Sequence, residues 1–235
     1  KKKSFTLLDI ENQFEINRGY LSVAIRTFLS IGLFQIQNKD KFNVDTAYLI
    51  NHKKLQLIIK TIDSDKLFLD LMNIYIDFKN IADNENSLEN KKETLLNDAL
   101  STLKNKKNTL LKNGDNRTQE LLYYLIEGFI VGPILSYLGY YNLSKKDIKN
   151  HNFSLYIENI LKISSLVDSN GDFTKKGFFF KKRLSSYGVT SSYLPLLANL
   201  ESIISKNKNL VWKRDEKGDE VHINRGMNVW GSGGA

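Results

Sequence analysis

The chain has 235 residues, of which 41% are hydrophobic, and it carries 13 Phe and 11 Tyr. This content excludes wholesale disorder and is enough for one large domain or two small ones. Cysteine is absent, which excludes disulfides, zinc–thiolate sites and cysteine nucleophiles. The apolar run that follows the three opening lysines is too short for a signal peptide, so we expect a cytoplasmic location.

The formal net charge of +8 suits an anionic partner such as nucleic acid. The lysines are scattered along the chain among asparagines, however, and basic clusters are short, such as Lys181-Lys182-Arg183. Scattered lysines are typical of an ordinary solvated surface. The charge pattern therefore argues against nucleic acid as the partner.

Residues 5–44 predict two helices followed by a short hairpin. Asn17 can cap the second helix, whose apolar residues recur with the helical period. Gly32 ends that helix, and an extended piece follows at residues 33–36. After a polar turn, residues 42–44 begin the return strand. This order of elements is typical of a winged-helix unit.

The middle of the chain predicts further amphipathic helices, and residues 121–141 form its longest apolar stretch. This stretch is about long enough to cross a bilayer. Glu127 and Pro133 lie inside it, together with three glycines and five tyrosines. A carboxylate at the centre of a bilayer costs about 3 kcal/mol. We therefore predict a fully buried helix of a soluble domain rather than a membrane span.

The pattern of the first segment returns later in the chain. A helix is predicted around residues 155–165, and residues 166–168 extend from it. Asn170-Gly171 predicts a type I′ hairpin turn, after which residues 173–174 begin the return. The predicted fold class is mainly α: a helical domain with two winged-helix-like units and short β-hairpins.

Three segments are expected. Residues 1–115 hold the first winged-helix-like unit and the amphipathic helices, and residues 116–205 hold the buried helix and the second unit. Residues 206–235 hold a β-hairpin, pairing 210–213 with 221–223, and then a glycine-rich connector to a catalytic core outside the chain. The connector shows no helical period.

No residue pattern predicts a complete catalytic centre. The histidines, His52, His151 and His222, lack the spacing of a metal site, and His222 alone lies beside the glycine-rich run. Glu127 is an isolated carboxylate for which a structural ion pair is favoured over a role as catalytic base. The glycine-rich run has neither the dinucleotide-binding fingerprint nor a P-loop, and a flexible linker remains its alternative interpretation.

Three stretches of the C-terminal part resemble a known family. They are NGDFTKKG at residues 170–177, YGVTSSYLP at residues 187–195 and RGMNVWGSGGA at residues 225–235. Together they resemble the region just before the catalytic domain of class I S-adenosylmethionine-dependent methyltransferases, in particular those embedded in polyketide synthases. The cofactor fingerprint of that family, an acidic-ended strand before a glycine turn, does not occur in this sequence.

The resemblance implies the N-terminal lid or platform region of a methyltransferase that acts on an acyl or other small-molecule substrate in polyketide biosynthesis. A downstream methyltransferase core would bind most of the S-adenosylmethionine. The residues that the resemblance places at the cofactor are Asn228, Trp230, Gly231, Ser232 and Gly233.

The resemblance names no catalytic residue, so whether the chain alone is an enzyme is left open. It implies an acyl carrier protein as a further partner, and it allows a divalent metal without naming a ligand. A winged-helix nucleic-acid-binding regulator and a structural interaction module are the alternative functions.

Overall fold

The computed structural model describes residues 4–14, 16–37, 46–61, 65–111, 117–205 and 209–233. The fold is mainly α with one small antiparallel sheet, so the predicted mainly α class is confirmed. Contacts group the chain into two compact units. The first unit comprises residues 1–63 with 199–219, and the second comprises 64–198 with 220–235.

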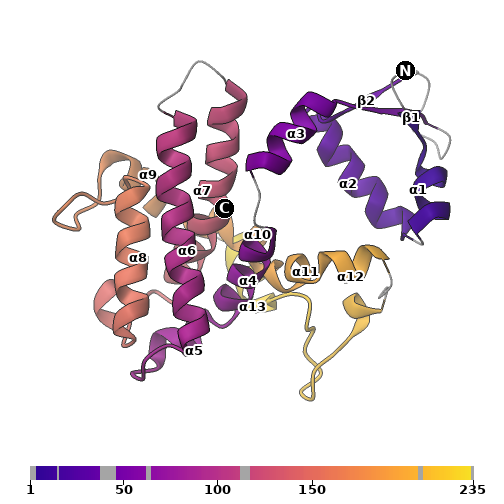
Figure 1. The fold of residues 1–235 in the computed structure, drawn as a ribbon. Helices are drawn as coiled ribbons and strands as arrows, with labels where there is room; N and C mark the ends of the chain where they lie inside the picture. Colours follow the sequence, from indigo (N-terminus) through magenta and orange to yellow (C-terminus); the bar gives the residue numbers. More distant parts are fainter. Residues whose placement is uncertain are drawn as a thin grey trace. The chain divides into compact units, whose positions relative to one another are not determined.

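The first unit combines helices with a three-stranded sheet (Figure 1). Its elements are β1 (Ser4–Phe5), α1 (Leu7–Phe14), α2 (Arg18–Ser30), β2 (Phe34–Ile36), β3 (Tyr48–Ile50), α3 (His52–Thr61), α12 (Leu200–Ser205) and the 3₁₀ helix η4 (Leu210–Trp212). The strand order is β1-β3-β2, and both pairs are antiparallel.

Local sequence explains how this unit begins. The Asn17 side chain accepts hydrogen bonds from the N–H groups of Gly19 and Tyr20, which confirms the predicted cap of α2. Gly32 follows the helix with a φ of 68°, a conformation that glycine adopts without strain. The return strand predicted at residues 42–44 lies outside the described residues, and β2 pairs with β3 instead.

The hairpin predicted near the C-terminal end is wrong in its strands. Residues 210–212 form η4, and residues 221–223 form no strand. The charged turn between them is present, because the Asp215 N–H donates to the Asp219 carbonyl at 2.9 Å. The Asp215 carboxylate also accepts from the backbone N–H of Lys217, so the loop satisfies polar groups locally. At its base Arg214 and Glu220 are β-bridge residues, which do not extend into strands.

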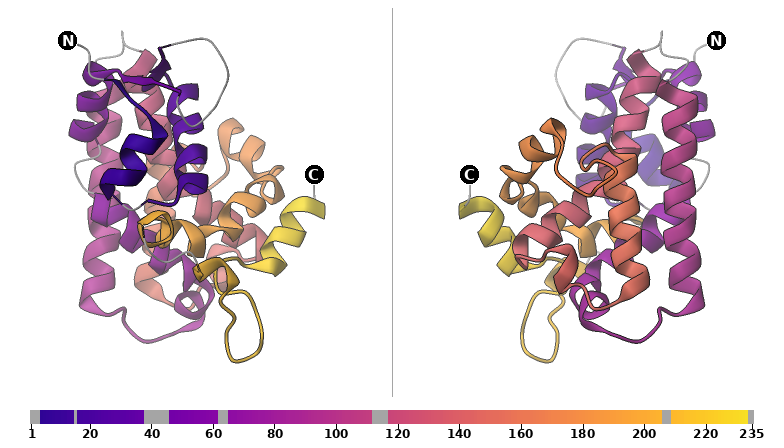
Figure 2. Two further views of the ribbon diagram at one scale, coloured as in Figure 1. Left: turned by 90° about the vertical axis from the view of Figure 1, so that its right-hand side faces the viewer. Right: turned by 90° about the vertical axis from the view of Figure 1, so that its left-hand side faces the viewer.

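The second unit is almost entirely helical, and α6, α7 and α8 lie side by side in it (Figure 2). Its elements are α4 (Asp65–Ile76), α5 (Phe78–Asp83), α6 (Asn90–Lys106), the π-helical turn η1 (Lys107–Leu111), α7 (Arg117–Tyr140), the 3₁₀ helix η2 (Lys145–Asp147), α8 (His151–Ile163), α9 (Lys175–Lys181), the 3₁₀ helix η3 (Ser185–Tyr187), α10 (Gly188–Ser192), α11 (Leu194–Ala198) and α13 (Arg225–Gly233).

Helix α7 is the long apolar helix that the sequence predicts, but it is not fully buried. Within the described chain it is the one helix long and apolar enough to cross a membrane, by length and composition only. More than half of that stretch is buried, which is typical of a core helix. Leu121, Tyr124, Leu125 and Phe129 are nevertheless each almost half exposed. The predicted full burial fails because this side of α7 borders an open pocket.

The second winged-helix-like segment runs from α8 through a tight turn into α9. Val167 and Phe173 form an isolated antiparallel bridge, in the place of the predicted hairpin. Gly171 has a φ of 89°, but Asn170 is not in the left-handed region, so the turn is not type I′. The Asp168 carboxylate sets this geometry by accepting from the N–H groups of Asn170 and Asp172.

Candidate functional site

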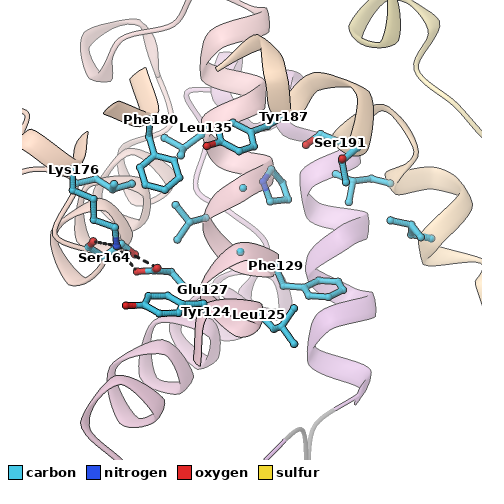
Figure 3. Close-up of a pocket in the computed structure, with 18 residues that line it drawn as sticks. Tyr124, Leu125, Glu127, Phe129, Leu135, Ser164, Lys176, Phe180, Tyr187 and Ser191 are labelled. Atoms are coloured by element: carbon cyan, nitrogen blue, oxygen red, sulfur yellow. Dashed lines mark hydrogen bonds and ion pairs between the residues drawn. The ribbon is translucent and has the colours of Figure 1, made fainter. Parts of the chain in front are cut away.

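A pocket of about 560 Å³ lies in the second unit (Figure 3). Helix α7 forms one wall along its half-exposed side. The other walls come from the end of α8, from α9, from η3 and from the short helices α10 and α11. The pocket is therefore built by segments that lie up to about seventy residues apart in the sequence, between Tyr124 and Leu197.

The wall formed by α7 is apolar, and its glycines give the pocket its width. A Cβ added at Gly128 or Gly132 would meet no atom within 4 Å, so both positions open onto free space. Pro133 lies inside the helix and carries no N–H, which leaves the carbonyl of Phe129 without its helical donor. The wall thus combines a smooth apolar surface with one backbone carbonyl that lacks its i+4 donor.

One end of the pocket carries its charged groups. The Lys176 Nζ lies 3.1 and 3.2 Å from the two carboxylate oxygens of Glu127, and it donates to the Ser164 carbonyl at 2.9 Å (Figure 3). The Tyr123 hydroxyl donates to Glu127 at 3.0 Å. This confirms the structural ion pair predicted for Glu127, whose side chain is only 11% exposed.

Burial holds Tyr123 in its protonated form. The pKa of its hydroxyl lies well above the ordinary value, first because of burial and then because of the nearby Glu127 carboxylate. Tyr123 is therefore a neutral hydrogen-bond donor over the physiological pH range. With this hydroxyl and the Lys176 ammonium both directed at it, the Glu127 carboxylate is well satisfied and poorly placed to abstract a proton from a ligand.

Ser164 adds an unused polar atom at the same end. Its hydroxyl is buried and has no hydrogen-bond partner among the described residues. The residue lines the pocket and is 1% exposed. A buried hydroxyl without a partner costs about 1–3 kcal/mol. A polar ligand atom that reached this end would find both a donor and an acceptor there.

Hydroxyl groups also lie at the opposite side of the pocket. The Ser191 hydroxyl donates to the Ser136 hydroxyl at 2.7 Å, which joins α10 to α7. Tyr187 borders the same region, and burial raises the pKa of its hydroxyl. The pocket is therefore an apolar slot with polar groups at its two sides.

The residues that the family resemblance places at the cofactor lie on α13, which is a correction to the predicted connector. The predicted run without helical period is a helix, and the described residues Asn228, Trp230, Gly231, Ser232 and Gly233 all belong to it. None of them lines the pocket. The overlooked signal is the four-residue spacing of Ile223, Met227 and Gly231, which are the buried positions.

The glycines of this region allow helix-to-helix contact. A Cβ at Gly231 would lie 2.5 Å from the Val189 backbone nitrogen, so α13 packs directly on α10. The ring of Trp230 packs equally closely on Gly188, where an added Cβ would lie 2.7 Å from the Trp230 Cε3 atom. Asn228 donates to the Ser192 hydroxyl at 3.0 Å, whereas Ser232 bonds only to its own helix. Close packing explains Gly231, while Gly233 faces open space.

Metal-binding groups do not gather in the described part of the chain. No group of three or more His, Asp or Glu side chains there could hold an ion. His222, the histidine that the sequence singled out, has a buried Nδ1 without a hydrogen-bond partner among the described residues. The sequence did not identify the pocket residues Ser164, Lys176 and Ser191. Lys176 and Ser191 lie in two of the stretches that carry the family resemblance, but nothing in those stretches marks them as pocket residues.

Comparison with known proteins supports the second winged-helix-like segment. Residues 127–207 match the family model described as the AprA winged helix domain. AprA is a polyketide synthase. No curated protein matches the chain. The matched range contains α8, the Val167–Phe173 bridge and α9, which are the elements of the second winged-helix-like segment. The chain therefore contains a winged-helix domain of the AprA type.

Proposed function

We propose that the chain is the lid or platform region of an S-adenosylmethionine-dependent methyltransferase in polyketide biosynthesis, and that its pocket holds the acyl substrate. One observation carries the proposal. Every residue that lines the pocket, apart from Tyr124 and Leu125, lies within the range that matches the AprA winged helix domain. The part of the chain with a polyketide-synthase relative is thus the part that builds the pocket.

The chemistry of the pocket favours an acyl group. Ligand pockets of 300–1,000 Å³ lined by apolar side chains with few polar groups are typical of small-molecule sites. An acyl chain would lie along the smooth wall at Gly128 and Gly132. Its carbonyl would lie at the polar end, where the Ser164 hydroxyl is free to donate and the Lys176 ammonium is near. Burial of the acyl chain along α7 would also exclude water from the reacting end of the substrate.

The methyl donor itself is assigned to a core outside this chain. When bound, S-adenosylmethionine supplies an electrophilic methyl group. The described residues of α13 form no open cradle for it, because the backbone at Gly231 is already occupied by α10. Contacts from Asn228, Trp230, Gly231, Ser232 and Gly233 to the cofactor remain a prediction. A divalent metal also remains a prediction, because no set of metal ligands gathers among the residues that the structure describes.

The acyl site is tested by titrating the chain with octanoyl-pantetheine in a calorimeter. We expect saturable binding that weakens at least tenfold in Gly132→Leu, because the new side chain fills open pocket space without a backbone clash. Gly233→Leu is the matched control, since it also adds a side chain in open space on a helix, but outside the pocket. Equal binding by both variants and the unaltered chain would refute the acyl site.

The assignment of S-adenosylmethionine to a core outside this chain is tested separately. Calorimetric titration of this chain with S-adenosylmethionine should show no tight binding, and tight binding would contradict the assignment of the cofactor to a downstream core. A gel-shift titration with duplex DNA at two salt concentrations addresses the regulator alternative. Strong binding that is lost steeply with salt would favour that alternative over a lid.

A further inference from the structure

Helix α9 and the turn before it carry a compact surface that the pocket does not use. We call it the basic–aromatic face. All of its side chains are exposed, and Phe178 and Phe179 are 53% and 51% exposed. Its members are Phe173, Lys175, Phe178, Phe179, Lys181, Lys182 and Arg183.

The cations of this face lie over its rings. The Lys181 Nζ lies 4.7 Å from the centroid of the Phe173 ring. The Arg183 guanidinium lies 3.9 Å from the centroid of the Phe179 ring, and its Nη1 donates to the Phe179 carbonyl at 3.1 Å. Cation–π contacts at exposed sites contribute about 0.5–1 kcal/mol each. These contacts hold the positive charges close to the apolar surface.

No ion pair among the described residues neutralises these charges, and the nearest carboxylate in the sequence is that of Asp172, in the turn next to Phe173. Between residues 173 and 183 the sequence has five basic residues and no Asp or Glu. Among the described residues, Lys175, Lys181, Lys182 and Arg183 form no ion pair. A solvated helix face normally mixes both signs of charge and exposes few large rings. Adjacent exposed aromatic residues together with arginine are typical of the centre of a protein–protein interface.

We propose that the basic–aromatic face docks an acidic protein that delivers the acyl group, and this inference rests on the proposed function. Charge complementarity selects an acidic surface, and the phenylalanines select one with exposed apolar side chains. Helix α9 also reaches the pocket, because Lys176 and Phe180 line it. A partner bound to the outer side of α9 would therefore lie one helix away from the acyl site.

Two other anionic partners fit less well. Single-stranded nucleic acid binds by stacking its bases on open aromatic faces, but the cations lie over the rings of Phe173 and Phe179. A membrane surface is bound by a long amphipathic helix with a wide apolar face, whereas α9 has seven residues. Both remain outcomes of the test.

The test measures fluorescence anisotropy of three labelled probes with the full chain. They are an 18-residue amphipathic helical peptide with glutamates on one face and leucines on the other, its Glu→Gln analogue, and a single-stranded DNA of equal charge. Vesicles with 30% anionic lipid are tested by co-sedimentation. We expect the acidic peptide to bind at least tenfold more tightly than its analogue, and more tightly than the DNA.

Two variants locate the binding. The triple variant K181E/K182E/R183E should lose at least tenfold in affinity for the acidic peptide, and F178A/F179A should lose about as much. The control K91E/K104E reverses two exposed lysines on α6 in the same unit and should bind as the unaltered chain does. Unchanged binding by the triple variant, or stronger binding of DNA or vesicles than of the peptide, would overturn the proposal.

Failure of this inference is distinguishable from failure of the proposed function. The peptide titration measures only the outer side of α9, whereas octanoyl-pantetheine measures only the pocket. Pocket binding without peptide binding would leave the lid function intact and remove the docking surface. Near-native circular dichroism of each variant ensures that a loss of binding does not come from unfolding.

Discussion

The two winged-helix-like segments of this chain have the same order of sequence features and different structures. Residues 4–50, the first segment, contain a three-stranded antiparallel sheet around a small apolar core of Leu7, Ile25 and Tyr48. Residues 151–181, the second segment, have a single bridge between Val167 and Phe173. The match to the AprA winged helix domain nevertheless covers the second segment and not the first.

The difference shows that the two segments depend on different interactions. In the first, strands pair across a sheet, and the centroid of the Phe5 ring lies 5.3 Å from that of Phe34 and 5.7 Å from that of Tyr48. In the second, a helix lies against the backbone that precedes the turn, and polar side chains close the loop. A winged-helix order in sequence therefore does not fix how much of the wing is a sheet.

The largest expected effect tests the sheet of the first segment. Tyr48 lies on the central strand β3 and is 1% exposed. Tyr48→Ala removes this ring from the core and should cost about 4 kcal/mol in the free energy of unfolding, measured by urea denaturation. Val23→Ala, on the exposed side of α2, should change it by less than about 0.5 kcal/mol. A small effect of Tyr48→Ala would show that the sheet is not what stabilises this segment.

The second expected effect tests the close contact of the second segment. A Cβ at Gly177 would lie 1.9 Å from the Leu166 carbonyl oxygen, a backbone atom that cannot move aside easily. Gly177→Ala should therefore destabilise the chain by about 3 kcal/mol in thermal denaturation. Gly128→Ala, in open space on α7, should instead stabilise it by about 0.5–1 kcal/mol. If both substitutions had the same sign, close packing of α9 would not explain Gly177.

A smaller effect compares the helix caps of the two segments. Asn17 accepts from two backbone N–H groups at the start of α2. Thr174 accepts from the Gly177 N–H at 3.1 Å and donates to the Ser165 carbonyl at 2.7 Å. Each change to alanine should cost about 1 kcal/mol by urea denaturation. Thr174→Ala should cost more than Asn17→Ala, because it also leaves a carbonyl of the loop unpaired, and the reverse order would contradict this.

The smallest effect is a pH dependence in the second segment. Hydrogen bonds first with Lys145 and then with Lys162 lower the pKa of Glu158 from its ordinary value of 4.5 to about 2. Because the folded-state pKa is lowered, this stabilisation is present above about pH 4.5 and is lost as the pH falls towards 2. Glu158→Gln should reduce the loss of melting temperature between pH 5 and pH 3. The corresponding change in the free energy of unfolding should be less than about 1 kcal/mol. An unchanged pH profile would show that the two ion pairs contribute nothing.

The sequence by itself determined the mainly helical class, the Asn17 cap, the ion-paired state of Glu127 and the presence of a winged-helix pattern. These depend on local spacing or on the cost of an isolated buried charge, which any fold must satisfy. The helix at residues 225–233 was overlooked because glycines lower helix propensity. Tertiary contact with α10 overrides that propensity at Gly231.

Only the tertiary structure decided where the pocket lies and which residues face it. Nothing in the sequence marks Ser164, Lys176 and Ser191 as pocket residues, and they line one pocket because α8, α9 and α10 pack around the half-exposed side of α7. The tertiary structure also decided that Gly177 and Gly231 serve helix packing, while Gly128 and Gly132 leave open space. The sequence does not distinguish a glycine that allows close helix packing from one that borders open space. The distinction depends on which atoms of other elements lie where a Cβ would be.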